Sequence, residues 1–350
     1  MEGNKKWIAL VVVVALIIGG IGGYMYYKRT PAYSLKLIEE SVKEHNWEKF
    51  NRHVDVKEIA DSAFDDLVAA SMSEDTSVDS GMKTLAAGFI QMFKPMVVNA
   101  LQDGIKEFVE TGTRTGSKDD KQNKEQAKDD QGNQAADNLL KNTRAAETKF
   151  TGIKSTETEG SIATVTLGLH DEKLSADYEI KLRMNQLDDG TWRLAKISNL
   201  KEFYKSVQEA EKKKLDQLNA PIRSEIDNAV KIGDIAGVVQ QKDSYGFSYE
   251  LILSADAQIN ASKPLSGFSG DITVTNPSGE VTTIHYNYDF NGSTNGTQKI
   301  ALSKELNPFI PGDSDMIKRR VQGYTFKASV TALKYQDGKI IELLSKLPET

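Results

Sequence analysis

The stretch Leu174-Ser-Ala-Asp-Tyr-Glu-Ile-Lys-Leu-Arg-Met184 alternates apolar and polar side chains over its whole length. Leu174, Tyr178 and Met184 belong to the apolar set, and charged residues occupy most of the intervening positions. A period of two is typical of an antiparallel strand that buries one face and exposes the other. This stretch therefore predicts a half-buried antiparallel strand.

The segments on either side extend this pattern into a domain. Residues 163–169 alternate in the same way, and Asp189-Gly190 predicts a turn into a further strand at 191–198. Upstream, apolar residues recur at helical spacing over 35–54, 56–67 and 82–108, and Pro95 should kink or break the third helix. Helices followed by a strand meander predict an α+β domain over residues 31–204, with helices covering one face of the sheet.

Two segments interrupt or end this domain. Residues 111–138 contain alanine as their only apolar residue type, so they should form a disordered insertion. Residues 202–218 are charged and helical in pattern, and Pro221 can start another helix at its first turn. We therefore expect a helical connector over 205–243.

The remaining part, residues 244–347, has an all-β pattern. Turn signals such as Asn276-Pro-Ser-Gly279 and Asp337-Gly338 separate short segments of β-forming residues. The candidate strands are 249–261, 269–275, 281–290, 298–306, 324–335 and 339–344. Short strands with regular turns predict a β-sandwich.

The N-terminal region has a different character. The run Trp7–Tyr27 carries no charge, and at about 1.5 Å per residue it matches the roughly 30 Å hydrocarbon core of a bilayer. A cleaved signal peptide is the rival interpretation, but it would have a shorter apolar core and a small-residue cleavage site. We expect a single membrane-spanning helix at 7–27, a short cytoplasmic tail at 1–6, and the bulk of the chain outside the cell membrane.

Composition excludes several kinds of chemistry. The net charge of −6 argues against a nucleic-acid binder, and the lack of cysteine excludes disulfides and thiol chemistry. None of the four histidines has metal-ligand spacing, and no nucleophile elbow, phosphate loop or dinucleotide fingerprint occurs. We therefore expect no catalytic residue, no metal and no cofactor, and we predict that the chain is not an enzyme.

Short segments resemble known families. Pro31-Ala-Tyr-Ser-Leu35, Trp47-Glu-Lys-Phe50, Val54-Asp-Val56 and Thr191–Asn199 are similar to a bacterial domain family of unknown function with a cone fold like that of nuclear transport factor 2. Other segments resemble Ig-like sandwiches of bacterial envelope proteins, which usually act as spacers or adhesion-type binding units. The matching pieces are Lys242–Phe247, Gly267–Val274, Gly279–Val281, Asn307–Gly312 and Gln336–Lys339.

A cone of helices on a curved sheet often encloses an apolar pocket, which would be a ligand site. The bulky residues that we expect near such a pocket are Trp47, Phe50, Tyr178 and Trp192. The alternative is that these side chains only fill the core, because aromatic residues dominate core burial in general.

The leading functional hypothesis is a non-catalytic, membrane-anchored envelope protein that binds a protein or a cell-surface polymer. The alternative is binding or sensing of a small apolar ligand by the cone-like domain.

Overall fold

The computed structural model describes residues 27–74, 80–112, 147–290 and 295–348, with a few positions between 132 and 144. The chain divides into two compact units, Met1–Ala210 and Glu211–Thr350. Helix α7 (Leu200–Ala229) begins in the first unit and ends in the second. Each unit is described separately below.

From residue 27 onward, the first unit begins with four helices: α2 (Pro31–Lys43), α3 (Trp47–His53), α4 (Val56–Glu74) and α5 (Ser80–Thr111). Side-chain caps set two of the starts. The Thr30 hydroxyl accepts a hydrogen bond from the backbone N–H of Tyr33, and the Asn46 side chain accepts one from that of Lys49. Of the predicted kink or break at Pro95, the break is wrong, because helix α5 continues through this residue.

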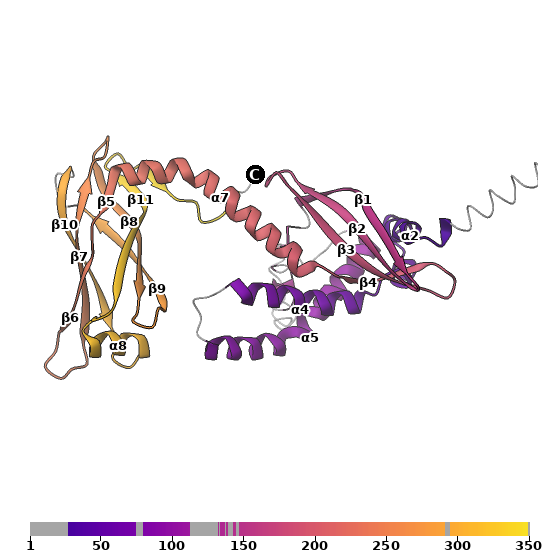
Figure 1. Cartoon of the computed structure of the whole chain (residues 1–350), viewed down its shortest axis with the longest axis horizontal. Coiled ribbons are helices and arrows are strands. Elements are labelled where there is room, and N and C mark those ends of the chain that lie inside the picture. Colours follow the sequence, from indigo (N-terminus) through magenta and orange to yellow (C-terminus); the bar gives the residue numbers. More distant parts are fainter. Residues whose placement is uncertain are drawn as a thin grey trace, which may run out of the picture. The chain divides into compact units, whose positions relative to one another are not determined.

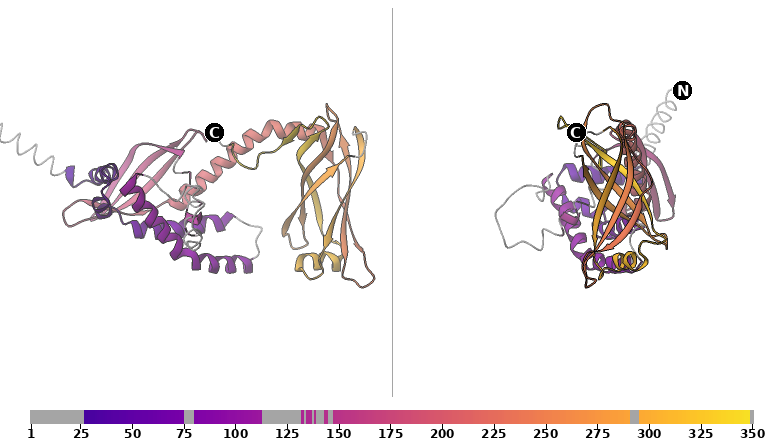
Figure 2. Two further views of the ribbon diagram at one scale, coloured as in Figure 1. Left: turned by 180° about the vertical axis from the view of Figure 1, so that it is seen from behind. Right: turned by 90° about the vertical axis from the view of Figure 1, so that its left-hand side faces the viewer.

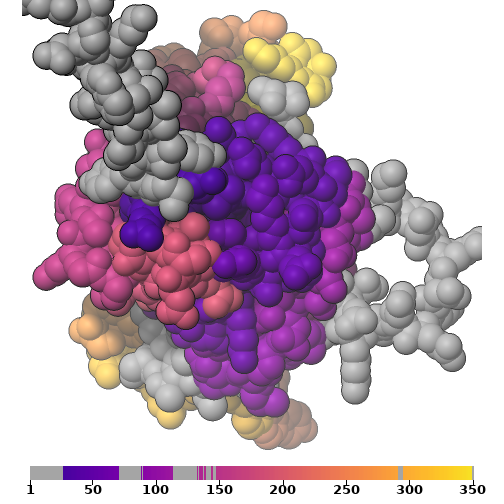
Figure 3. Space-filling model, turned by 90° about the vertical axis from the view of Figure 1, so that its right-hand side faces the viewer, coloured from indigo at the N-terminus to yellow at the C-terminus, as the bar shows by residue number. Residues whose placement is uncertain are grey.

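A four-stranded antiparallel sheet follows in the order β1-β2-β3-β4. Its strands are β1 (Thr148–Glu159), β2 (Ile162–Asp171), β3 (Ala176–Gln186) and β4 (Trp192–Ile197). The helices cover one face of this sheet, as the period-two pattern predicted (Figure 1). Figure 3 shows the indigo and violet helices lying directly against the strands of this unit. The first unit is therefore α+β.

The second unit contains two four-stranded sheets. One has the order β10-β7-β5, with β6 also pairing with β7, and the other has the order β12-β11-β8-β9. The strands are β5 (Val230–Ile232), β6 (Ala236–Gln241), β7 (Tyr249–Ile259), β8 (Leu265–Thr275), β9 (Val281–Asp289), β10 (Gly296–Leu306), β11 (Thr325–Tyr335) and β12 (Ile340–Glu342). Short helix α8 (Pro311–Arg319) connects β10 to β11.

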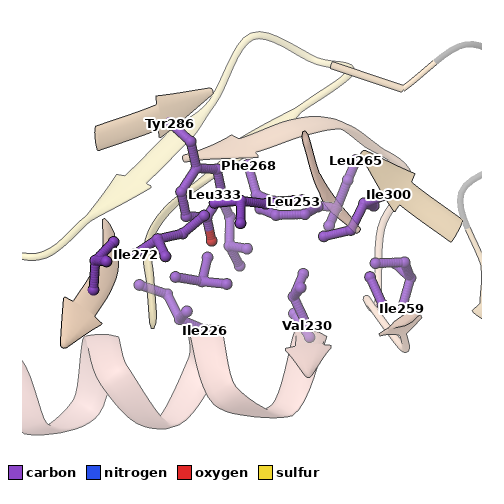
Figure 4. Close-up of a cluster of buried hydrophobic side chains, with 14 of the residues drawn as sticks. Ile226, Val230, Leu253, Ile259, Leu265, Phe268, Ile272, Tyr286, Ile300 and Leu333 are labelled. Carbon is purple, nitrogen blue, oxygen red and sulfur yellow. The ribbon is translucent and has the colours of Figure 1, made fainter. Parts of the chain in front are cut away.

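Both sheets contribute to one core. Leu251 of β7, Phe268 of β8 and Leu333 of β11 are fully buried in it. Figure 4 shows Ile226 of α7 pointing into the same cluster, which also contains Val230 at the start of β5. The end of α7 is therefore part of the core of the second unit.

Three expectations need correction here. The second unit is not all-β, because α8 and the end of α7 belong to it. The expected helical connector at 205–243 is helical only to Ala229, since residues 230–232 and 236–241 form strands that pair with β7. Most of the expected disordered insertion at 111–138 lies outside the described residues, but Ala136 at its end is buried against α4 and α5.

The described residues contain no counterpart of the membrane-spanning helix in the predicted fold class. No helix in the described part of the chain, from residue 27 onward, is long and apolar enough to cross a membrane. Apart from Tyr27, the predicted span at 7–27 lies outside the described residues.

Candidate functional site

The four residues expected to line a pocket in the first unit pack in separate places. Trp47 and Phe50 lie on α3, with ring centroids 5.8 Å apart and planes at 24°. They pack with Val54 at the end of α3, with Val56 at the start of α4 and with Val109 of α5. This pair therefore fixes α3 to its helical neighbours.

Tyr178 and Trp192 belong to two other clusters. The Tyr178 ring meets Phe203 of α7 edge to face, with centroids 5.6 Å apart. Trp192 is 2% exposed, and its indole N–H donates to the backbone oxygen of Arg29 at 2.7 Å. The four side chains fill the core in three clusters, so they do not converge on one ligand pocket.

An open hollow of about 880 Å³ lies between α3 and the β3–β4 turn. It is lined by Asn46, Glu48, Lys49, Asn51, Arg52, His53, Leu187, Asp188, Asp189 and Arg193. Most of the charges there are already paired: Arg52 contacts Asp189 at 2.5 Å, and Lys49 contacts Glu44 at 3.1 Å.

The carboxylate of Asp189 stabilises the turn. It accepts hydrogen bonds from the Thr191 hydroxyl at 2.6 Å and from the Thr191 backbone N–H at 2.9 Å. The hydroxyl contact is the main reason why the pKa of Asp189 is lowered, and Arg52 adds to it. A carboxylate held ionised in this way suits a structural role, not that of a proton donor.

The histidine of the hollow is also structural. His53 is 5% exposed, and its Nδ1 lies 2.9 Å from the backbone oxygen of Lys49. No group of three His, Cys, Asp or Glu side chains in the described residues could hold a metal ion. The contacts of Asp189, Arg52 and His53 in the hollow are therefore structural.

The second unit exposes a group of large apolar side chains on two loops. We call it the aromatic end; its members are Tyr245 and Phe247 in the β6–β7 loop and Phe309 and Ile310 in the β10–α8 loop. Their exposed fractions are 82%, 65%, 78% and 52%, respectively. Figure 2 shows the β6–β7 loop and α8 at the same end of the two sheets.

The β6–β7 loop is held by one carboxylate. Oδ1 of Asp243 accepts the backbone N–H of Gly246 at 2.8 Å and that of Phe247 at 3.0 Å. Gly246 has φ +77°, a conformation that costs a residue with a side chain free energy. The backbone of Lys242 and Ser248 closes the loop with a 2.8 Å hydrogen bond. The loop therefore presents Phe247 in a defined position.

The β10–α8 loop is held by a second set of bonds. The Asn307 side chain accepts the backbone N–H of Phe309 at 2.9 Å, and the Asn307 N–H donates to Asp313 at 2.9 Å. Asp313 is 8% exposed, and Lys304 lies 3.3 Å from its other oxygen. The ring of Phe309 then stacks on Phe247, with centroids 6.5 Å apart.

Helix α8 continues the same surface and is fixed by a polar contact. The Tyr324 hydroxyl donates to Asp315 at 2.7 Å, and Arg319 pairs with the same carboxylate at 2.9 Å. Burial, followed by the contact with Asp315, raises the pKa of Tyr324 to about 12. This contact fixes α8 to the segment that leads into β11.

Sequence reasoning missed the aromatic end. The segments Lys242–Phe247 and Asn307–Gly312 were recognised only as pieces typical of an Ig-like sandwich. The available signal was the presence of aromatic residues between turn formers, where a polar residue is usual. Comparison with protein-family models, curated proteins and solved structures gave no match.

Proposed function

We propose that this chain is a non-catalytic binding protein whose second unit contacts a macromolecular partner through the aromatic end. The observation that carries the proposal is the exposure of four large apolar side chains on two loops that hydrogen bonds hold in place.

Contact between an apolar cluster and water is unfavourable in free energy, and a partner that covers the cluster removes this contact. Burying one large apolar side chain contributes about 1.5–3 kcal/mol, so a partner that covers the aromatic end gains substantially. Contiguous apolar patches on a surface mark interaction sites, and aromatic residues are frequent among the residues that dominate binding energy.

Preorganisation supports the same assignment. The side chains of Asp243 and Asn307 hold the two loops before any partner arrives, which lowers the entropy lost on binding. Loops on a rigid β scaffold are also the usual position of binding residues.

The non-catalytic part of the proposal rests on the polar hollow of the first unit. Arg52 and Asp189 of the hollow are held in an ion pair and in a turn, and His53 faces a backbone oxygen. The alternative of an apolar ligand has less support, because the four aromatic side chains expected near its pocket lie in three clusters. We therefore propose the binding function alone.

Site-specific cross-linking tests the proposal. A photoreactive amino acid replaces Phe309 in the full chain, in the cells that produce it, and a second variant carries it at Ile340. Ile340 is also exposed, at 60%. It lies on β12, which belongs to the sheet without β6, β7 and β10. We expect a discrete adduct from position 309 that disappears when Phe247→Ala is added, and none from 340. Equal adducts from both positions, or none from 309, would contradict the proposal.

A further inference from the structure

The free edge of β6 is a second feature of the unit that carries the aromatic end. Strand β6 pairs with β7 from Ala236 opposite Ser254 to Gln241 opposite Tyr249. Within the described residues no strand pairs with the other side of β6. One row of its backbone groups therefore faces away from the sheet.

The register identifies those groups. In an antiparallel pair, alternate residues direct both their N–H and C=O groups toward the neighbouring strand. The backbone N–H of Lys242 donates to Ser248 at 2.8 Å, so every second residue before Lys242 also faces β7. The backbone groups that point outward are those of Gly237, Val239 and Gln241.

Two other edge strands, β1 and β10, carry features that discourage pairing, and β6 lacks them. Strand β1 has two register shifts and the charged residues Lys149, Lys154 and Glu157, and β10 has Lys304 and Glu305. Charged side chains and bulges are the usual protection of a sheet edge. The six residues of β6, Ala-Gly-Val-Val-Gln-Gln, include no charge and no proline, and their pairing has no register shift.

The edge is continuous with the aromatic end. Strand β6 leads directly into the loop that carries Tyr245 and Phe247. Its outward side chain Val238 is 60% exposed, whereas Val239 packs against the core. A strand added beside β6 would place one side chain next to Val238 and extend toward the rings of the loop.

We propose that the free edge of β6 binds an extended, uncharged segment of a partner polypeptide, which adds to the sheet as a further strand. This inference rests on the proposed function and gives the partner a chemical class. Unpaired backbone donors and acceptors are satisfied by another extended backbone, which a polypeptide supplies. The absence of charge on β6 favours a segment without charged residues, because nothing on the edge would pair with them.

The test uses short random peptides displayed on phage and selected on the immobilised full chain. We expect enrichment of uncharged sequences rich in β-branched and aromatic residues. A selected peptide should slow hydrogen exchange at the amides of Gly237, Val239 and Gln241. The variant Val239→Pro removes one outward N–H and should weaken binding about tenfold or more.

A second variant is needed because Val239→Pro could weaken binding by disturbing the fold. Val238→Lys changes an exposed side chain and should also weaken peptide binding, whereas the control Val281→Lys, on edge strand β9, should not. The proposal is overturned if no peptide is enriched, if Val238→Lys binds as well as the parent chain, or if exchange slows elsewhere. Dimerisation through β6, seen by sedimentation and abolished by Val238→Lys, would replace the partner with a second copy.

The two proposals fail separately. Peptide binding at β6 without cross-linking from position 309 would remove the role of the aromatic end. Cross-linking from 309 that persists in Val238→Lys, without peptide binding, would remove only the strand-addition site.

Discussion

The rings of Phe247 and Phe309 stack on each other with centroids 6.5 Å apart and planes at 20°, although they come from separate loops and both are mostly exposed. Because both rings are mostly in contact with water, they add little to the stability of the second unit's core. Their arrangement is more simply explained by a surface that a partner covers.

The first prediction concerns these two rings. Phe247→Ala and Phe309→Ala should each change the free energy of unfolding of the second unit by less than about 1 kcal/mol, because the side chains are mostly exposed. Each should weaken partner binding by about 2 kcal/mol or more if the rings dominate the contact. Denaturant unfolding and a binding titration on the same variants measure the two effects. A large loss of stability would place the rings among the structural residues.

The second prediction concerns a buried ring in the same unit. Phe268 is 0% exposed and lies 5.4–6.0 Å, between ring centroids, from Tyr286, Tyr288 and Phe290. Phe268→Ala should cost about 3–5 kcal/mol of unfolding free energy, because it leaves a cavity in a packed core. Calorimetry of the full chain measures the shift. If Phe268→Ala melted at the same temperature as Phe309→Ala, Phe268 would not be a core residue.

The third prediction concerns the end of the second unit. The side-chain amide of Asn219 on α7 donates to the backbone oxygen of Leu344 at 2.9 Å and accepts its N–H at 2.8 Å. Asn219→Ala should cost about 1–3 kcal/mol and speed hydrogen exchange at the Leu344 amide, because both backbone groups lose their partner. The matched control is Gln217→Ala, an exposed residue of the same helix, which should leave exchange at Leu344 unchanged.

The fourth prediction is a pH dependence. The pKa of Tyr324 is raised from 10.0 to about 12, because burial and Asp315 disfavour the phenolate in the folded chain. The resulting stabilisation is fully present below pH 10 and is lost as the pH rises through about 12. The difference in unfolding free energy between the parent chain and Tyr324→Phe should therefore shrink across this interval.

A control variant separates this effect from general alkaline unfolding. Tyr245→Phe changes a side chain that is 82% exposed, and its stability curve should follow that of the parent chain at every pH. If the curves of Tyr324→Phe and the parent chain stay parallel between pH 10 and 12, the hydrogen bond to Asp315 does not have the assigned role.

Most strands could be predicted from the sequence, because the alternation of apolar and polar residues that indicates a strand is a local pattern. The alternation from Leu174 to Met184 places one face toward the helices, and β3 is observed at Ala176–Gln186. Strands β1, β5 and β6 and helix α8 were not predicted. Strand β6 contains no apolar alternation, and Pro311-Gly312 has the composition of a turn, although Pro311 here occupies the first turn of a helix.

The candidate site was harder to predict because exposure is not a local property. Trp47 and Trp192 were expected beside one pocket, but they lie in different clusters, and this division depends on how helices meet strands. Phe247 and Phe309 look like ordinary apolar residues in the sequence. Only the turns held by Asp243 and Asn307 leave their rings in water and bring them together.

Carbene footprinting tests the central claim most directly, by comparing the purified full chain with the same chain in the cells that produce it. If a partner covers the aromatic end, labelling of Tyr245, Phe247 and Phe309 falls strongly in cells. Labelling of Ile340 and Phe150, which are 60% and 61% exposed, stays the same. Equal labelling of the three aromatic rings in both samples would contradict the proposed binding surface.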